Sequence, residues 1–255
     1  MKKCTDYISA SQIKQFLFCP LAYKYGYVDG IKGKGNEYTA YGSAVHKALQ
    51  LNFEQKITSG KDLPSREVID LFEKEFSKIV QEENIFIDSL QGSIFIQAGA
   101  LTLESYITKI APTIDPLYCE KKFEVTLKNY PIKILAYVDL ITKDDRIIDF
   151  KTVGKTWKQQ YSKNKVLNDV QVTIYSALFR KVFKKQEKSI EFHILPRGSS
   201  ECEIIVTDRT EEQIKQVLEL ATAIEVSIEK GLLIPNIANC PSCAYKDICP
   251  KLAIY

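Results

Sequence analysis

Residues 135–152, LAYVDLITKDDRIIDFKT, constrain the fold of this chain more than any other segment. Two runs rich in β-branched and aromatic residues flank a polar turn at residues 143–145, a pattern typical of neighbouring strands rather than of a helix. Residues 119–127 form a similar run, which is followed by a second turn signal at residues 128–131. We therefore expect three successive strands, arranged as an antiparallel meander, at the centre of the fold.

Apolar residues recur at helical spacing on both sides of these strands. Val45, Leu49 and Phe53 share one helical stripe within residues 41–57, and Val170, Ile174 and Leu178 share another within residues 166–183. Further helices are expected at residues 11–18 (capped by Ser9 or Ser11), 65–84, 92–110 and 210–231, and further strands at residues 189–196 and 202–207. This order of elements predicts an α/β sheet with a helical N-terminal elaboration.

The chain has 255 residues and no segment that resembles a linker, so a single domain is expected. Within it we distinguish a helical part at residues 1–112, a core at 113–208, and a C-terminal helix with a cysteine-rich tail at 209–255. The net charge of +3 permits nucleic-acid binding without indicating it. The first residues lack the apolar stretch of a signal peptide, and no run approaches the roughly 20 apolar residues of a membrane span. We expect a cytoplasmic protein with no membrane association.

A carboxylate–lysine pattern lies on the predicted strands. Asp149 and Lys151 are two residues apart, so their side chains emerge from the same face of a strand. A short turn could bring Asp139, late in the preceding strand, beside Asp149. Two such carboxylates suit Mg²⁺ or Mn²⁺, and a nearby lysine could orient a water and stabilise charge on a phosphate. A solvated strand face shows the same spacing, but Asp149 interrupts the apolar string IIDF.

Several motifs follow one another along the chain: YGSAVHKALQ, AYVDLI, IIDFKT, QVTIY and a terminal cysteine cluster. In this order they resemble the PD-(D/E)XK nuclease superfamily, specifically the RecB and AddB nuclease domains and the related CRISPR-associated exonucleases. The resemblance implies a restriction-endonuclease-like α/β core, with a mixed central sheet flanked by helices and a C-terminal iron–sulfur loop. It also implies a Mg²⁺- or Mn²⁺-dependent exonuclease that acts on single-stranded DNA ends, with recombination, repair or CRISPR-adaptation proteins as partners.

The resemblance assigns roles to individual residues. It makes His46, Asp139 and Asp149 metal ligands, together with the backbone carbonyl of Phe150. Asp139 and Asp149 would form the catalytic set with Lys151 as the catalytic lysine.

The same resemblance makes Gln171 and Tyr175 substrate-binding or site-organising residues, and their i, i+4 spacing places them on one helix face beside the apolar stripe. Glu124 falls where related proteins often carry a glutamate, and Ala136 stands in a region where relatives often have glycine. Two alternatives stay open: a structure-specific endonuclease of the same superfamily, and a non-hydrolytic subunit that binds DNA ends.

A basic, aromatic segment is a second candidate for contact with nucleic acid. Tyrosines interleaved with lysines can stack bases and neutralise phosphates, although plain surface edges share this composition. The residues concerned are Tyr23, Tyr25, Tyr27 and Tyr41, with Lys24, Lys32 and Lys34. The other histidine, His193, lies within an apolar strand, where a structural role is expected.

The tail carries cysteines at C-x₂-C-x₅-C spacing: Cys240, Cys243 and Cys249. A cytoplasmic protein keeps its thiols reduced, so such a cluster indicates metal ligation. Three thiolates need a fourth ligand, and the family resemblance supplies Cys19, which gives a [4Fe–4S] cluster. A structural Cys₄ zinc site is the alternative. The remaining cysteines, Cys4, Cys119 and Cys202, are left over, and the last two are expected to be inert residues of the sheet or core.

Overall fold

A computed structural model of the chain describes residues 7–126, 133–154, 157–161 and 163–249. The turn predicted at residues 128–131 and Cys4 lie outside this part. The chain forms two compact units. The first consists of Met1–Lys34, Phe123–Ala136 and Thr210–Tyr255, and the second of Gly35–Lys122 and Tyr137–Arg209. The prediction of a single domain stays a prediction.

Two strands, β2 (Pro116–Thr126) and β3 (Lys133–Thr142), contribute residues to both units. The other elements of the first unit are β1 (Ile8–Ser9), α1 (Ala10–Phe18), α2 (Pro20–Tyr23), the π-helix η1 (Lys24–Val28), α9 (Glu211–Glu229) and the 3₁₀-helix η3 (Ile237–Ser242). Those of the second are α3 (Glu37–Ser59), α4 (Ser65–Glu82), α5 (Ser89–Lys109), η2 (Ala111–Thr113), β4 (Arg146–Val153), α6 (Trp157–Gln160), α7 (Lys163–Leu167), α8 (Val170–Phe183), β5 (Ser189–Pro196) and β6 (Glu203–Thr207).

Side-chain capping fixes where several of these helices begin. Ser9 accepts a hydrogen bond from the backbone of Gln12 at the start of α1, so the predicted cap is confirmed. Asn36 caps α3 in the same way, and the helix ends at Gly60, which has a φ of 75°. The helix predicted at residues 166–183 is interrupted, because Asp169 accepts hydrogen bonds from the backbone of Gln171 and Val172 and thereby starts a new helix.

The strands pair in both directions, so the expected mixed sheet is confirmed. In the second unit β3 runs antiparallel to β4, as predicted, with Leu140 opposite Ile148. Strand β4 runs parallel to β5 after the α6–α8 crossover, and β5 runs antiparallel to β6. In the first unit the short β1 pairs in parallel with the start of β3, with Ile8 opposite Ile134.

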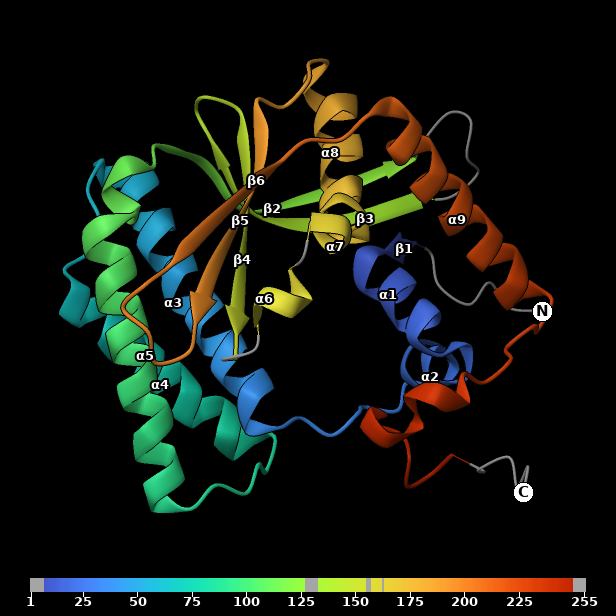
Figure 1. Cartoon of the computed structure of the whole chain (residues 1–255), viewed down its shortest axis with the longest axis horizontal. Helices are drawn as coiled ribbons and strands as arrows, with labels where there is room; N and C mark the ends of the chain where they lie inside the picture. The colour runs from blue at the N-terminus through green and yellow to red at the C-terminus, as the bar shows by residue number, and fades with distance from the viewer. Residues whose placement is uncertain (1–6, 127–132, 155–156, 162, 250–255) are drawn as a thin grey trace. The chain divides into compact units, whose positions relative to one another are not determined.

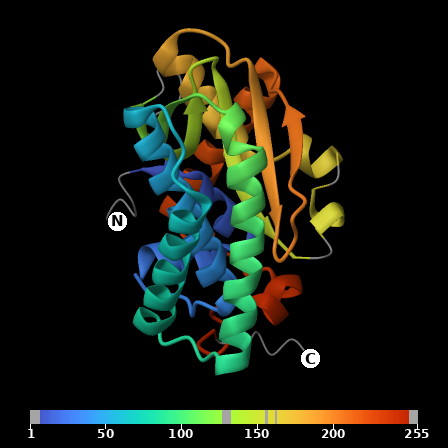
Figure 2. The same cartoon turned by 90° about the vertical axis from the view of Figure 1, so that its left-hand side faces the viewer.

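Helices cover both faces of β4. Phe150 stacks on Phe53 of α3 and meets Tyr106 of α5 edge-on, with ring centroids 5.9 and 5.8 Å apart. The next residue, Lys151, points to the opposite face and contacts Gln171 of α8. Figures 1 and 2 show α3, α4 and α5 grouped on one side of β4 and β5. The buried core of the second unit therefore lies between these helices and the sheet.

Candidate active site

The two predicted aspartates come together where β3 and β4 pair. Leu140 lies opposite Ile148 in these antiparallel strands, and Asp139 and Asp149 are the neighbouring residues on the same side of that pair. Asp149 is fully buried and Asp139 nearly so. The backbone N–H of Phe150 donates a hydrogen bond of 2.8 Å to Oδ2 of Asp139, which fixes the orientation of this carboxylate. The hairpin thus holds both acids in an interior position.

Asp149 forms a tight pair with Lys151 on the same face of β4. Lys151 Nζ lies 2.5 Å from Asp149 Oδ2, yet within the described residues neither oxygen of Asp149 accepts a hydrogen bond of good geometry. Burial raises the pKa of Asp149, while Lys151 opposes the rise. Burial lowers the pKa of Lys151, but Asp149 and Asp139 outweigh it and raise the pKa overall. Oδ1 of this buried carboxylate has no hydrogen-bond partner among the described residues, and such an oxygen is suited to a cation.

His46 reaches the same site from α3. Its Nδ1 lies 3.6 Å from Oδ2 of Asp139. Burial lowers the pKa of His46 despite the opposing charge of Asp139, and a hydrogen bond to the Phe150 backbone also opposes the decrease. A neutral imidazole is the form that binds metal ions. His46, Asp139, Asp149 and the backbone of Phe150 thus bring nitrogen and oxygen donors to one site, although in the described residues the three side chains are not grouped closely enough to hold a metal ion as they stand.

Gln171 links the lysine to helix α8. Its Oε1 accepts a hydrogen bond of 3.1 Å from Lys151 Nζ, and its Nε2 donates one of 2.7 Å to the hydroxyl of Tyr175. Tyr175 is only 3% exposed, because residues 172–179 of α8 are buried on all sides. The sequence interpretation, which placed the pair on a face beside the apolar stripe, underestimated this burial. Tyr175 supports Gln171 from the interior.

Glu120 is a candidate site residue that the sequence reasoning missed. It lines the same cleft as His46 and has a φ of 47°, a left-handed conformation that is rare for a side chain in a strand. Burial and then Asp139 raise the pKa of Glu120 to about 7, against the effect of Lys47. Glu124, the glutamate considered from the sequence, instead forms an exposed ion pair of 2.9 Å with Lys133. The sequence CEKKFEV is typical of an extended strand and does not indicate the left-handed backbone of Glu120.

The four predicted cluster cysteines lie in the first unit. Cys19, Cys240, Cys243 and Cys249 all line one cavity of about 440 Å³. The backbone N–H of Asn236 donates to the sulfur of Cys19 over 3.4 Å, which ties the N-terminal cysteine to the tail. Within the part of the chain that the structure describes, no three His, Cys, Asp or Glu side chains are grouped closely enough to hold a metal ion.

The aromatic, basic segment is not an open stacking surface throughout. Tyr23 and Tyr41 are buried, with exposed fractions of 0% and 2%, so these two are core residues. Tyr41 packs against Phe72, and Tyr23 against Tyr27. The interleaved pattern could not distinguish these packed rings from exposed ones. Among the leftover cysteines, Cys119 and Cys202 are half-buried against the core of the second unit, and burial raises the pKa of both thiols.

Residues 7–250 match the model of the PD-(D/E)XK nuclease superfamily, and the chain belongs to that superfamily. No curated protein matches it. Among solved structures it is similar to a candidate exonuclease from Eubacterium rectale, with 14% identity, a TM-score of 0.59, and coverage of 96% of this chain and 90% of that one. This likeness shows the fold. The protein SSO0001 is 13% identical over 96% of this chain and 86% of its own, at a TM-score of 0.45.

None of the helices in the described residues is long and apolar enough to cross a membrane.

Proposed function

We propose that this protein is a metal-dependent deoxyribonuclease that hydrolyses phosphodiester bonds as an exonuclease on single-stranded DNA ends. The observation that carries the proposal is the buried Asp149 carboxylate beside Lys151 and near Asp139, in a chain of a nuclease superfamily. Burying a carboxylate and an ammonium together is costly, and such groups in a cleft are candidates for a functional site. The description of the Eubacterium rectale neighbour as a candidate exonuclease agrees with this proposal.

The residues that would hold Mg²⁺ or Mn²⁺ are His46, Asp139 and Asp149, with the Phe150 carbonyl. Such an ion supplies charge stabilisation at the phosphate and increases the acidity of a bound water. Asp139 is already oriented by the Phe150 N–H. Lys151 is positioned by Gln171, so its ammonium can stabilise the negative charge that develops on the phosphate oxygens. Tyr175 positions the Gln171 amide in turn.

A [4Fe–4S] cluster held by Cys19, Cys240, Cys243 and Cys249 is the second part of the proposal. It is supported by the four cysteines that line one cavity in the first unit. Only one closely spaced cysteine pair is present in the tail, whereas zinc sites usually combine two such pairs. The cluster would have a structural role, because it would link the two ends of the chain. A Cys₄ zinc site is the alternative.

The decisive experiment incubates the full chain with end-labelled linear single-stranded DNA, linear duplex and circular single-stranded DNA. Each substrate is tested with Mg²⁺, with Mn²⁺ and with EDTA. The proposal expects metal-dependent release of mononucleotides or short products from linear single strands, with circles left intact. Cleavage of circles would favour the endonuclease alternative. Tight binding of ends without cleavage in either metal would favour the non-hydrolytic subunit, which would hold ends for recombination or CRISPR-adaptation proteins.

A further inference from the structure

One face of α3 forms a wall of the cleft that contains His46. The residues on this wall follow two rows at i, i+4 spacing, so they share a single helix face. These rows are Tyr38, Gly42, His46 and Gln50, and Thr39, Ser43 and Lys47. The cleft has a volume of about 810 Å³ and is also lined by Glu120 and by Thr152, which directly follows Lys151. The face therefore leads away from the candidate active site along the helix.

Tyr38 occupies the N-terminal end of this wall and is 54% exposed. The guanidinium carbon of Arg197 lies 4.5 Å from the centre of the Tyr38 ring, and 5.0 Å from the ring of Phe95. Phe95 meets the edge of Tyr38, with centroids 5.6 Å apart at 67°. Arg197 follows β5, and its backbone N–H donates to the carbonyl of Val153 over 2.9 Å. An exposed ring is thus fixed in place by a cation and a buried aromatic residue.

The positive charge of Arg197 is available to bind a ligand. Among the residues that the structure describes, no Asp or Glu forms an ion pair with Arg197. A guanidinium that stacks on an aromatic ring keeps its N–H edge available for a phosphate. The pairing of an aromatic face with an unneutralised arginine is what binds a nucleotide of a single strand. A cation–π pair that serves folding alone would not need to stand at the end of a nuclease cleft.

We propose that Tyr38 and Arg197 form a binding site for one nucleotide of a single-stranded DNA substrate, with the base on Tyr38 and a phosphate on Arg197. This inference rests on the proposed function. Tyr38 and His46 are two helical turns apart, or about 12 Å along the axis. That span corresponds to about three or four stacked nucleotides, so the site would hold the strand at that distance from the bond to be cleaved.

The test measures affinity for fluorescein-labelled oligothymidylate in EDTA, using Lys151→Ala protein so that the DNA stays intact. Into this background we would introduce Tyr38→Ala, Tyr38→Phe, Arg197→Lys and, as a matched control, Phe86→Ala, whose ring is 92% exposed and does not line the cleft. A second series would use oligonucleotides with a single abasic site moved along the strand. Thermal unfolding of each variant would verify that the fold is kept.

We expect Tyr38→Ala to weaken binding by about tenfold, the loss typical of one stacked base, while Tyr38→Phe and Phe86→Ala bind like the parent. Arg197→Lys should weaken binding, because lysine keeps the charge but loses the planar stack. The parent should lose affinity when the abasic site reaches one position, and Tyr38→Ala should not. Unchanged binding by folded Tyr38→Ala, or equal losses at every abasic position, overturns the nucleotide site while leaving the nuclease proposal intact. If the unsubstituted chain neither binds nor cleaves DNA, both the nucleotide site and the nuclease proposal are overturned.

Discussion

At the scale of single residues, Asp149 and Lys151 are two charged groups whose burial carries an unfavourable free energy of desolvation. Asp149 is fully buried, and the Lys151 side chain is 18% exposed. Such buried ion pairs contribute little net stability, because desolvation of the two charges offsets their attraction. A pair that contributes little to folding agrees with the proposed role of both side chains at a phosphate.

Asp149→Ala and Lys151→Ala should each reduce the rate of DNA cleavage by about a hundredfold or more while leaving DNA binding largely intact. The reason is that each change removes a group proposed to act on the reacting phosphate. The measurement is the single-turnover degradation of end-labelled single strands in Mg²⁺. Asp115→Ala and Lys143→Ala are matched controls, because these residues form an exposed ion pair of 2.8 Å. Parental rates in either active-site variant would refute the assignment.

Glu120→Gln should decrease cleavage by at least about tenfold, because it removes a third carboxyl from the vicinity of Asp139 and His46. Glu124→Gln is the matched control: it makes the same chemical change four residues later, at the exposed pair with Lys133. Both rates would be measured on the same labelled strand, with thermal unfolding as a test of the fold. If Glu124→Gln is impaired and Glu120→Gln is not, the glutamate of the site has been misassigned.

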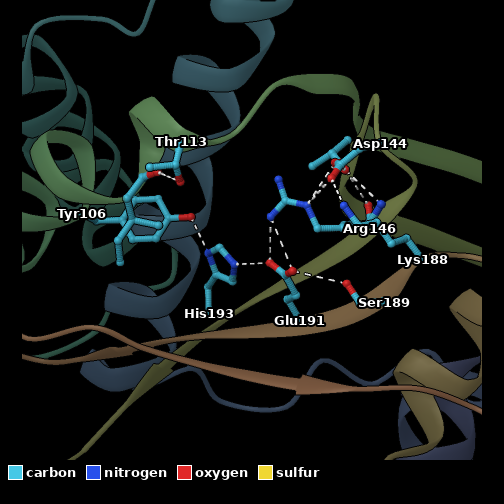
Figure 3. Close-up of polar contacts among 10 residues, drawn as sticks. Tyr106, Thr113, Asp144, Arg146, Lys188, Ser189, Glu191 and His193 are labelled. Atoms are coloured by element: carbon cyan, nitrogen blue, oxygen red, sulfur yellow. Dashed lines mark hydrogen bonds and ion pairs between the residues drawn. The ribbon is translucent and has the colours of Figure 1, made fainter.

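At the scale of elements, a polar network holds β4, β5 and α5 together (Figure 3). The hydroxyl of Tyr106 lies 2.7 Å from Nδ1 of His193, and Nε2 of His193 lies 3.1 Å from Glu191. Glu191 also accepts a hydrogen bond of 3.1 Å from Arg146, which in turn pairs with Asp144. His193 is 1% exposed, as the apolar strand pattern around it predicted. The network satisfies polar groups that the sheet buries.

Asp144 should make the stability of this network dependent on pH. Hydrogen bonds from Lys188, Thr142 and Arg146 hold the pKa of Asp144 well below its usual range. A carboxylate with a lowered folded pKa stabilises the protein above its unfolded pKa of about 3.9 and loses that contribution as the pH falls. Because the side chain is 44% exposed, Asp144→Asn should decrease the free energy of unfolding by less than about 1 kcal/mol at neutral pH.

Urea unfolding of the parent and Asp144→Asn at pH 7, 4 and 3 would measure this effect. The difference in the free energy of unfolding should be the same at pH 7 and above the unfolded pKa of about 3.9, begin to shrink between pH 4 and 3, and vanish only below the lowered folded pKa. A difference at pH 3 that is as large as the one at pH 7 would mean that the carboxylate charge is not what stabilises the turn.

At the scale of the whole molecule, the cysteine cavity in the first unit brings residues from the two ends of the chain together. A shared cluster would close a very long loop and restrict the unfolded chain. By analogy with disulfides that close long loops, the stabilisation should be about 3–5 kcal/mol.

Protein purified without oxygen should therefore be brown and contain iron. Cys243→Ser should lose the colour and make both ends of the chain more sensitive to protease. Cys202→Ser is the control, because this cysteine is half-buried in the second unit and outside the cavity. Metal analysis and limited proteolysis are the measurements. Stoichiometric zinc without iron would overturn the cluster assignment and leave the nuclease site unaffected.

Much of the fold follows from local patterns in the sequence. Helices α3, α4 and α5 lie where apolar residues recur at helical spacing, and β3 and β4 lie where short apolar runs flank a turn. The shared face of Asp149 and Lys151 follows from the two-residue period of a strand, and a short turn suffices to bring Asp139 close. These features depend on neighbours in sequence, so the residues alone determine them.

Other features depend on contacts between distant segments, and only the tertiary structure decided them. The burial of Tyr23, Tyr41 and Tyr175 depends on which elements cover them. Glu120, and not Glu124, lines the cleft of His46, and its left-handed backbone within β2 could not be read from the composition of the strand. Likewise, the Tyr38–Arg197 stack joins the start of α3 to the end of β5. A sequence pattern reports the preferences of a residue for its immediate neighbours, whereas burial and site geometry are set by the packing of elements far apart in the chain.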